Sequence, residues 1–180
     1  MDAANYDDWA SFADAYLSAA KILGTGGRNA DFYFGLGPFS QTLGLASELT
    51  IKAMLLKLGY DPTKIREFGH DLEKLHSEIN KDCSDKIERI CTEVAVYIRF
   101  NGVSVPQEFS DFAKSNDRNP LEYYLLSTQL KALNYNYHND RDDGAKFRTR
   151  YPDPEKRFRS FNADVIFFNM IEIRALSDAL

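Results

Sequence analysis

The sequence predicts an all-α fold, a single-domain helical bundle of five or six helices with a long loop before the last helix. Four segments repeat apolar residues with the 3.6-residue period of a helix, and a specific helix start signal occurs at residues 119–122. Alternating strand-like runs of useful length are missing. The 180 residues fit one domain, 1–180, that is large enough to bury a core without disulfides.

An apolar stripe predicts the first helix, which starts near Trp9 and stops at the glycines that follow residue 23. We expect a second helix to open after Pro38, with Ser40 as its candidate N-cap, and to run to Gly59. This second helix is apolar nearly all round, which predicts a central position in the bundle.

Asp61 and Pro62 predict a short helical turn, because they combine an N-cap with a first-turn proline. Segments 72–79 and 84–98 each carry an apolar stripe and predict two separate helices, whereas residues 101–118 read as a loop. These assignments place two amphipathic helices in the middle of the chain.

Asn119, Pro120 and Glu122 supply an N-cap, a first-position proline and a capping glutamate, which predict a helix that runs through Lys131. The segment 134–160 is rich in Asn, Asp, Arg, Gly and Pro and predicts an extended loop. Asn162 then caps the last predicted helix.

Charge and cysteine content restrict the possible function classes. The net charge of −5 gives the whole molecule no attraction for nucleic acid or anionic lipid, so such binding requires a local patch. Cys83 and Cys91 are the only cysteines and lack CxxC spacing, which favours reduced thiols in the cytoplasm. We expect no membrane insertion, no metal and no cofactor.

A polar cluster is predicted around the second helix. Glu48 and Lys52 lie four residues apart among apolar residues, which predicts an intrahelical ion pair. A buried carboxylate favours a further donor, and the candidates are His70 at the start of its helix and Arg150. We therefore expect Glu48, Lys52, His70 and Arg150 to form one structural cluster.

Glu48 and Lys52 within an apolar helix, then Gly69-His70-Asp71-Leu72, and later Arg150-Tyr151-Pro152 resemble, in that order, the HEPN superfamily of helical domains. The resemblance covers roughly residues 35–152. It implies a bundle of four or five helices, frequent dimerisation, and contact with RNA or nucleotides in many members. It also implies association with nucleotidyltransferases and with prokaryotic defence or toxin systems.

Active members of that superfamily are metal-independent ribonucleases marked by an Arg, four to six further residues, and a His. The histidines here are His70, His76 and His138; Arg66 precedes His70 with only three residues between. Lys131 precedes His138 with six between, so it fits the spacing but replaces the guanidinium with a point charge. If the helix reaches residue 138, Lys131 and His138 share a face and are the candidate catalytic pair. The alternative is an exposed loop without chemistry.

Residues 146–159 combine six basic residues with only two acidic ones, a local charge of +4. Aromatic side chains alternate with the cations, which suits RNA because bases stack on rings while cations neutralise phosphates. The alternative is that the rings anchor a long loop and the arginines pair with the acidic surface. The predicted RNA-binding residues are Lys146, Arg148, Arg150, Tyr151, Arg157 and Arg159.

The leading functional hypothesis from these patterns and this resemblance is a non-catalytic or weakly catalytic HEPN-like module. It would form a homodimer and act through RNA or a nucleotidyltransferase-type partner protein, in prokaryotic defence or a toxin–antitoxin pair. Two alternatives remain open: a divergent metal-independent ribonuclease, and an oligomeric scaffold without nucleic-acid contact.

Overall fold

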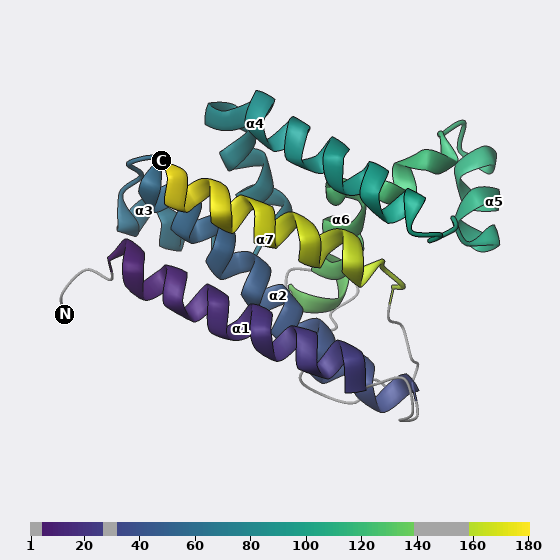
Figure 1. Ribbon diagram of the computed structural model, residues 1–180, viewed down its shortest axis with the longest axis horizontal. Helices are drawn as coiled ribbons and strands as arrows, with labels where there is room; N and C mark the ends of the chain where they lie inside the picture. Colours follow the sequence, from purple (N-terminus) through teal and green to yellow (C-terminus); the bar gives the residue numbers. More distant parts are fainter. Residues whose placement is uncertain (1–4, 27–31, 139–158) are drawn as a thin grey trace.

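A computed structural model describes residues 5–26, 32–138 and 159–180 (Figure 1). These residues form seven α-helices and one 3-10 helix, with no strand among them, so the all-α class is confirmed. The elements are α1 (Tyr6–Gly26), α2 (Phe32–Lys57), α3 (Pro62–Glu67), α4 (Leu72–Phe100), α5 (Gln107–Ser115), η2 (Pro120–Tyr124), α6 (Leu126–Tyr137) and α7 (Ala163–Ala179).

Helix α2 is the centre of the bundle, as its apolar circumference predicts. It packs against α1, α3, α4, α6 and α7, and it runs antiparallel to α1 (Figure 1). Its side chains Ile51, Met54 and Leu55 are fully buried in the core. Any charged group on its inner faces is therefore surrounded by other helices.

The start of α2 differs from the predicted one. The helix begins at Phe32, so Pro38 lies inside it and Ser40 is a fully buried helical residue rather than the N-cap. Proline removes one intrahelical hydrogen bond, and packing of α1 along α2 compensates for that loss.

The helices predicted at 72–79 and 84–98 are two arms of one helix, α4. Cys83 has non-helical backbone angles, φ −134° and ψ 29°, and Figure 1 shows the two arms running in different directions. The segment 101–118, predicted as loop, contains α5. Because α5 and the short helix α3 are added, the described residues form seven α-helices, against the five or six expected.

Most of the polar residues predicted to cap the start of a helix do so. Asp61 accepts hydrogen bonds from the backbone of Thr63 and Lys64 at the start of α3. The capping box of Asn119 and Glu122 is present, but it opens the short helix η2, and α6 begins only at Leu126.

The first and last helices are joined by polar contacts. The hydroxyl groups of Tyr6 and Ser177 lie 3.0 Å apart, and Arg174 lies 3.2 Å from the carboxylate of Asp14. These contacts hold α1 against α7. None of the helices in the described ranges is both long enough and apolar enough for a membrane span.

Candidate functional site

Three side chains, two of them distant in the sequence, meet around the buried carboxylate of Glu48. Oε1 of Glu48 accepts a hydrogen bond from Nζ of Lys52 at 2.7 Å. Oε2 accepts from the hydroxyl of Tyr137 at 2.6 Å and lies 2.8 Å from Nδ1 of His70. We call Glu48, Lys52, His70 and Tyr137 the Glu48 cluster. Three donors and one full positive charge compensate this carboxylate.

The Glu48–Lys52 pair is well shielded from water, because the two side chains are only 5% and 7% exposed. Lys52 also lies 5.5 Å from the ring centroid of Trp9 on α1. A cation above an indole face gains further attraction. The cluster therefore connects α1, α2, the start of α4 and the end of α6.

Local sequence determines where His70 points. Gly69 has φ +61°, in the left-handed region that favours glycine, and it turns the chain between α3 and α4. Asp71 then caps α4 by accepting from the backbone N–H groups of Glu73 and Lys74. His70 lies between these two fixed points, so its backbone is held while its ring reaches Glu48.

The last turn of α6 fixes the start of α4 from the other side. Oδ1 of Asn134 accepts from the backbone N–H of Leu72 at 3.0 Å, and its amide group donates to Asp71. Asn134 is buried, so these bonds replace water that the amide would otherwise contact. The hydrogen bonds of Asn134 thus hold the segment that carries His70 against α6.

A glycine of α2 makes room for Tyr137. An ideal Cβ atom at Gly44 would lie 2.4 Å from Cδ2 of Tyr137, closer than any normal contact. Gly44 is one helical turn before Glu48, so a ring lying on Gly44 can place its hydroxyl at the carboxylate. The position of Tyr137 in the cluster therefore requires a glycine at residue 44.

His70 is the exposed member of the Glu48 cluster. Its side chain is 57% exposed, and its ring meets that of Tyr137 edge-on, with centroids 6.2 Å apart and planes at 89°. Nδ1 points toward Glu48, so the opposite edge of the imidazole is the one available to solvent. The cluster presents one oriented histidine on the surface.

The predicted polar cluster can now be compared with the observed one. Glu48, Lys52 and His70 are brought together as expected, while Arg150 lies outside the described residues. Tyr137 was not predicted as a member. No regular sequence spacing links residue 137 to residue 48. The only indication of a further member was that a buried carboxylate needs several hydrogen-bond donors.

Lys131 and His138 do not share a continuous helix. Lys131 is exposed on α6, but the helix ends at Tyr137 and His138 has extended backbone angles, φ −87° and ψ 153°. The helical repeat that would place both side chains on one face therefore stops one residue short. No catalytic pairing of these residues follows from the helix.

His76, the third histidine, differs from His70 in its surroundings. Burial lowers the pKa of His76 to about 4, and the amide nitrogen of Asn80 lies 3.3 Å from its ring nitrogens. The ring is therefore neutral near neutral pH, and its residue is only partly exposed. His76 serves as a natural control for His70.

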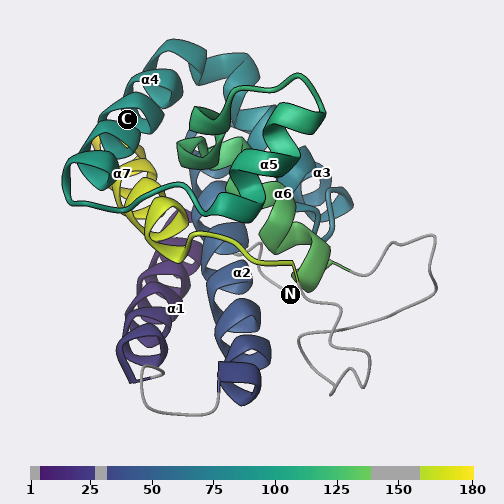
Figure 2. The same cartoon turned by 90° about the vertical axis from the view of Figure 1, so that its right-hand side faces the viewer.

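The end of α6 also holds the end of the basic segment. The side chain of Asn136 donates to the backbone carbonyl of Arg159 and accepts from its N–H, both at 2.8 Å. The guanidinium of Arg159 lies 3.9 Å from the ring centroid of Tyr135. Figure 2 shows the chain toward α7 starting beside the end of α6. The predicted RNA-binding residues outside the described ranges are Lys146, Arg148, Arg150, Tyr151 and Arg157.

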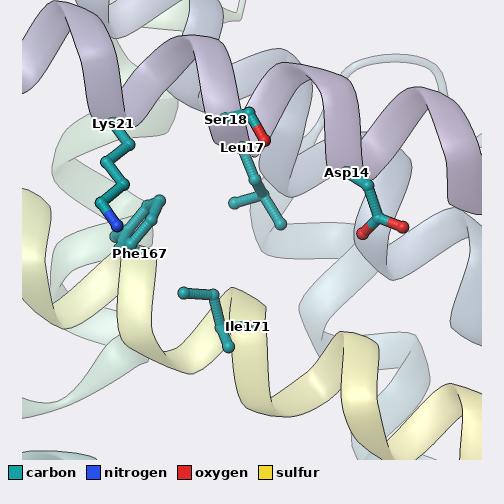
Figure 3. Close-up of a pocket in the computed structure, with 6 residues that line it drawn as sticks. All are labelled: Asp14, Leu17, Ser18, Lys21, Phe167 and Ile171. Atoms are coloured by element: carbon teal, nitrogen blue, oxygen red, sulfur yellow. The ribbon is translucent and has the colours of Figure 1, made fainter.

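A separate groove of about 270 Å³ lies between α1 and α7 (Figure 3). Its floor is apolar, and Asp14 and Lys21 lie toward opposite ends. It shares no residue with the Glu48 cluster, and Asp14 is already paired with Arg174. Among the described residues, no three His, Cys, Asp or Glu side chains gather where a metal ion could be held.

The site therefore consists of an oriented, exposed histidine beside the end of α6, to which Arg159, the last residue of the basic segment, is attached. Its chemistry suits hydrogen bonding, ring stacking and proton transfer. Comparisons of the chain with protein-family models, with curated proteins and with solved structures gave no match.

Proposed function

We propose that the chain is a HEPN-like RNA-binding module whose contact surface is centred on the C-terminal end of α6. The observation that carries this proposal is the pair of Arg159 and Tyr135, an exposed guanidinium 3.9 Å from a ring centroid. Arginine planes and aromatic rings are the groups on which unpaired bases stack. This pair is the described end of a segment with a local charge of +4.

The position of the segment supports the same proposal. His138 precedes it and Arg159 ends it, and both adjoin the last turn of α6. Tyr135 and Tyr137 are two residues apart and so project from different sides of that helix. His70 contacts Tyr137, while Arg159 contacts Tyr135. Both contacts belong to the last turns of α6, and we propose that one RNA strand passing this helix end meets both.

The module is tested by titrating fluorescein-labelled oligouridylate with the protein and following anisotropy at several salt concentrations. The test variant carries Arg148→Ala, Arg157→Ala and Arg159→Ala. The matched control removes the same charge elsewhere, with three exposed residues of α4 and α5 changed: Lys86→Ala, Arg89→Ala and Lys114→Ala.

If the segment contacts phosphates, the test variant should bind more weakly, and the salt slope should fall by about 2, or roughly 0.7 for each lost contact. The control should bind as the wild type does. Equal weakening of both variants would indicate non-specific charge attraction, and flat curves for the wild type at low salt would favour the scaffold alternative.

The resemblance also leads us to propose a homodimer, working in prokaryotic defence or beside a nucleotidyltransferase-type partner. Exposed apolar side chains at the end of α4, including Val96, Tyr97 and Phe100, support association. Light scattering should report twice the monomer mass of 20.6 kDa. A species of monomer mass alone at micromolar concentration would contradict the dimer.

A second function, metal-independent cleavage of RNA, is favoured by the Glu48–His70 contact. A carboxylate that orients an imidazole is suited to proton transfer. RNA incubated with the protein in EDTA should then be cleaved by the wild type and by His76→Ala, but not by His70→Ala. Lys131→Ala and His138→Ala test the pair predicted from the sequence. Uncleaved RNA in every case leaves the binding module as the function.

A further inference from the structure

The hydrogen bonds of Glu48 fix which nitrogen of His70 carries the proton. The carboxylate is paired with Lys52 and offers only acceptor oxygens to its other neighbours. Nδ1 of His70, 2.8 Å from Oε2, must therefore be the donor. In a neutral imidazole with a protonated Nδ1, Nε2 keeps its lone pair and is a hydrogen-bond acceptor.

This acceptor faces outward. The side chain of His70 is 57% exposed while Nδ1 is bound inside, and no described residue forms a hydrogen bond with Nε2. The rotation of the ring is limited as well, because its edge-on contact with Tyr137 and its bond to Glu48 act together. In the neutral form of the ring, the surface therefore presents an acceptor in a fixed direction.

A neutral acceptor differs from the charged groups that bind the RNA backbone. Arginine and lysine side chains are donors only, so they bind phosphates but cannot accept a bond from a ribose hydroxyl. A carboxylate could accept that bond, but its charge would repel the neighbouring phosphates. An imidazole lone pair accepts without repulsion. The 2'-hydroxyl is the group by which a protein distinguishes RNA from DNA.

We propose that His70 determines specificity for ribose: its Nε2 accepts a hydrogen bond from a 2'-hydroxyl of single-stranded RNA bound at the end of α6. This inference rests on the proposed RNA-binding function and adds to it a preference for RNA over DNA. Glu48 is then a positioning residue, since it acts only by setting the tautomer and direction of the ring.

The first test compares three labelled oligomers with the same base: oligouridylate, its 2'-deoxy analogue and its 2'-O-methyl analogue. The 2'-O-methyl group removes the donor while keeping the oxygen. The wild type should bind the ribose oligomer roughly fivefold more tightly than either analogue, because that ratio corresponds to the net binding free energy of one hydrogen bond.

Two conservative variants separate the two nitrogens of the ring. His70→Asn keeps a donor toward Glu48 but has no acceptor at the position of Nε2, so it should bind all three oligomers equally, at the wild-type affinity for DNA. His70→Gln keeps an outward acceptor and should retain the ribose preference. His76→Asn is the control and should behave as the wild type. Urea unfolding of each variant shows that the fold is kept.

The outcomes for the inference and for the proposed function are distinct. Binding of RNA and DNA with equal affinity by the wild type overturns the ribose preference alone, as does His70→Asn if it weakens both equally. No binding to any oligomer overturns the proposed function and the inference together. A second readout needs no RNA: nitrogen NMR should find the proton of His70 on Nδ1, and a proton on Nε2 would overturn the assignment.

Discussion

The ring of Tyr137 lies against the backbone of Gly44, so closely that a Cβ atom at residue 44 would be 2.4 Å from Cδ2 of the ring. Gly44→Ala should therefore push the ring away from Glu48 and lower the free energy of unfolding by about 1–3 kcal/mol. Urea unfolding measures this change.

The same substitution should have the opposite sign once the ring is removed. In a Tyr137→Ala background, Gly44→Ala meets no ring and gains the higher helix propensity of alanine, up to about 1 kcal/mol. A Gly44→Ala protein as stable as the wild type, or the same loss in both backgrounds, would contradict the close contact.

Removing the carboxylate should be costly because its partner is also buried. Glu48→Ala leaves the ammonium of Lys52, only 7% exposed, without its ion-pair partner. We expect the free energy of unfolding to fall by about 3 kcal/mol. Tyr137→Phe removes one hydrogen bond from the cluster and should cost about 1 kcal/mol.

Replacing both charges of this pair provides the control. Glu48→Leu combined with Lys52→Met leaves no isolated charge in the core and should recover most of the lost stability, as measured by urea unfolding. A double variant as unstable as Glu48→Ala would mean that the loss arises from packing rather than from the uncompensated ammonium.

The pH dependence of stability should contain a contribution from His76. Burial lowers the pKa of this ring to about 4, from its ordinary value of 6.5. Between these values the unfolded chain binds a proton that the folded chain does not, so stability should fall as pH drops from 6.5 toward 4. The loss is on the order of 3 kcal/mol at most.

Urea unfolding of the wild type and of His76→Gln at a series of pH values measures this contribution. The variant lacks the titrating ring, so its stability should fall less over the same interval. Parallel pH profiles for the two proteins would contradict the assignment.

Cys91 should react slowly with thiol reagents. Burial raises the pKa of its thiol to about 11, so little thiolate is present at mildly alkaline pH. In a Cys83→Ser protein, iodoacetamide should modify native Cys91 roughly two orders of magnitude more slowly than it modifies the same residue in urea. Equal rates would mean that the thiol is accessible.

The fold class could be predicted because most of the bundle follows a periodic pattern. The stripe through Ile87, Ile90, Val94 and Ile98 is buried along α4. Periodicity could not predict that two apolar stripes belong to one helix. Ser84 and Asp85 resemble a helix start, yet α4 continues through a kink at Cys83. Local signals mark places where a helix can begin, and tertiary packing decides whether it does.

The end of α6 is a second example. Asn134 and Asn136 resemble loop residues, and the helix was predicted only through Lys131. Both asparagines are buried in α6 and bind distant backbone, Asn134 at Leu72 and Asn136 at Arg159. These long-range bonds stabilise helical turns that propensity alone disfavours. The same bonds extend α6 to Tyr137 and so bring it into the Glu48 cluster, which is why periodicity did not identify this tyrosine as a member.

The two flanks of residues 139–158 are attached to neighbouring residues of one helical turn, Arg159 to Asn136 and His138 directly after Tyr137. Closing a chain between fixed ends costs only about 0.6 kcal/mol more for each doubling of its length. The last turn of α6 therefore determines where the chain leaves and rejoins the bundle, whatever the length of the stretch between. The two ends of the stretch are thus set by one helical turn, and an entropic cost that grows so slowly with length places little constraint on how many residues join them.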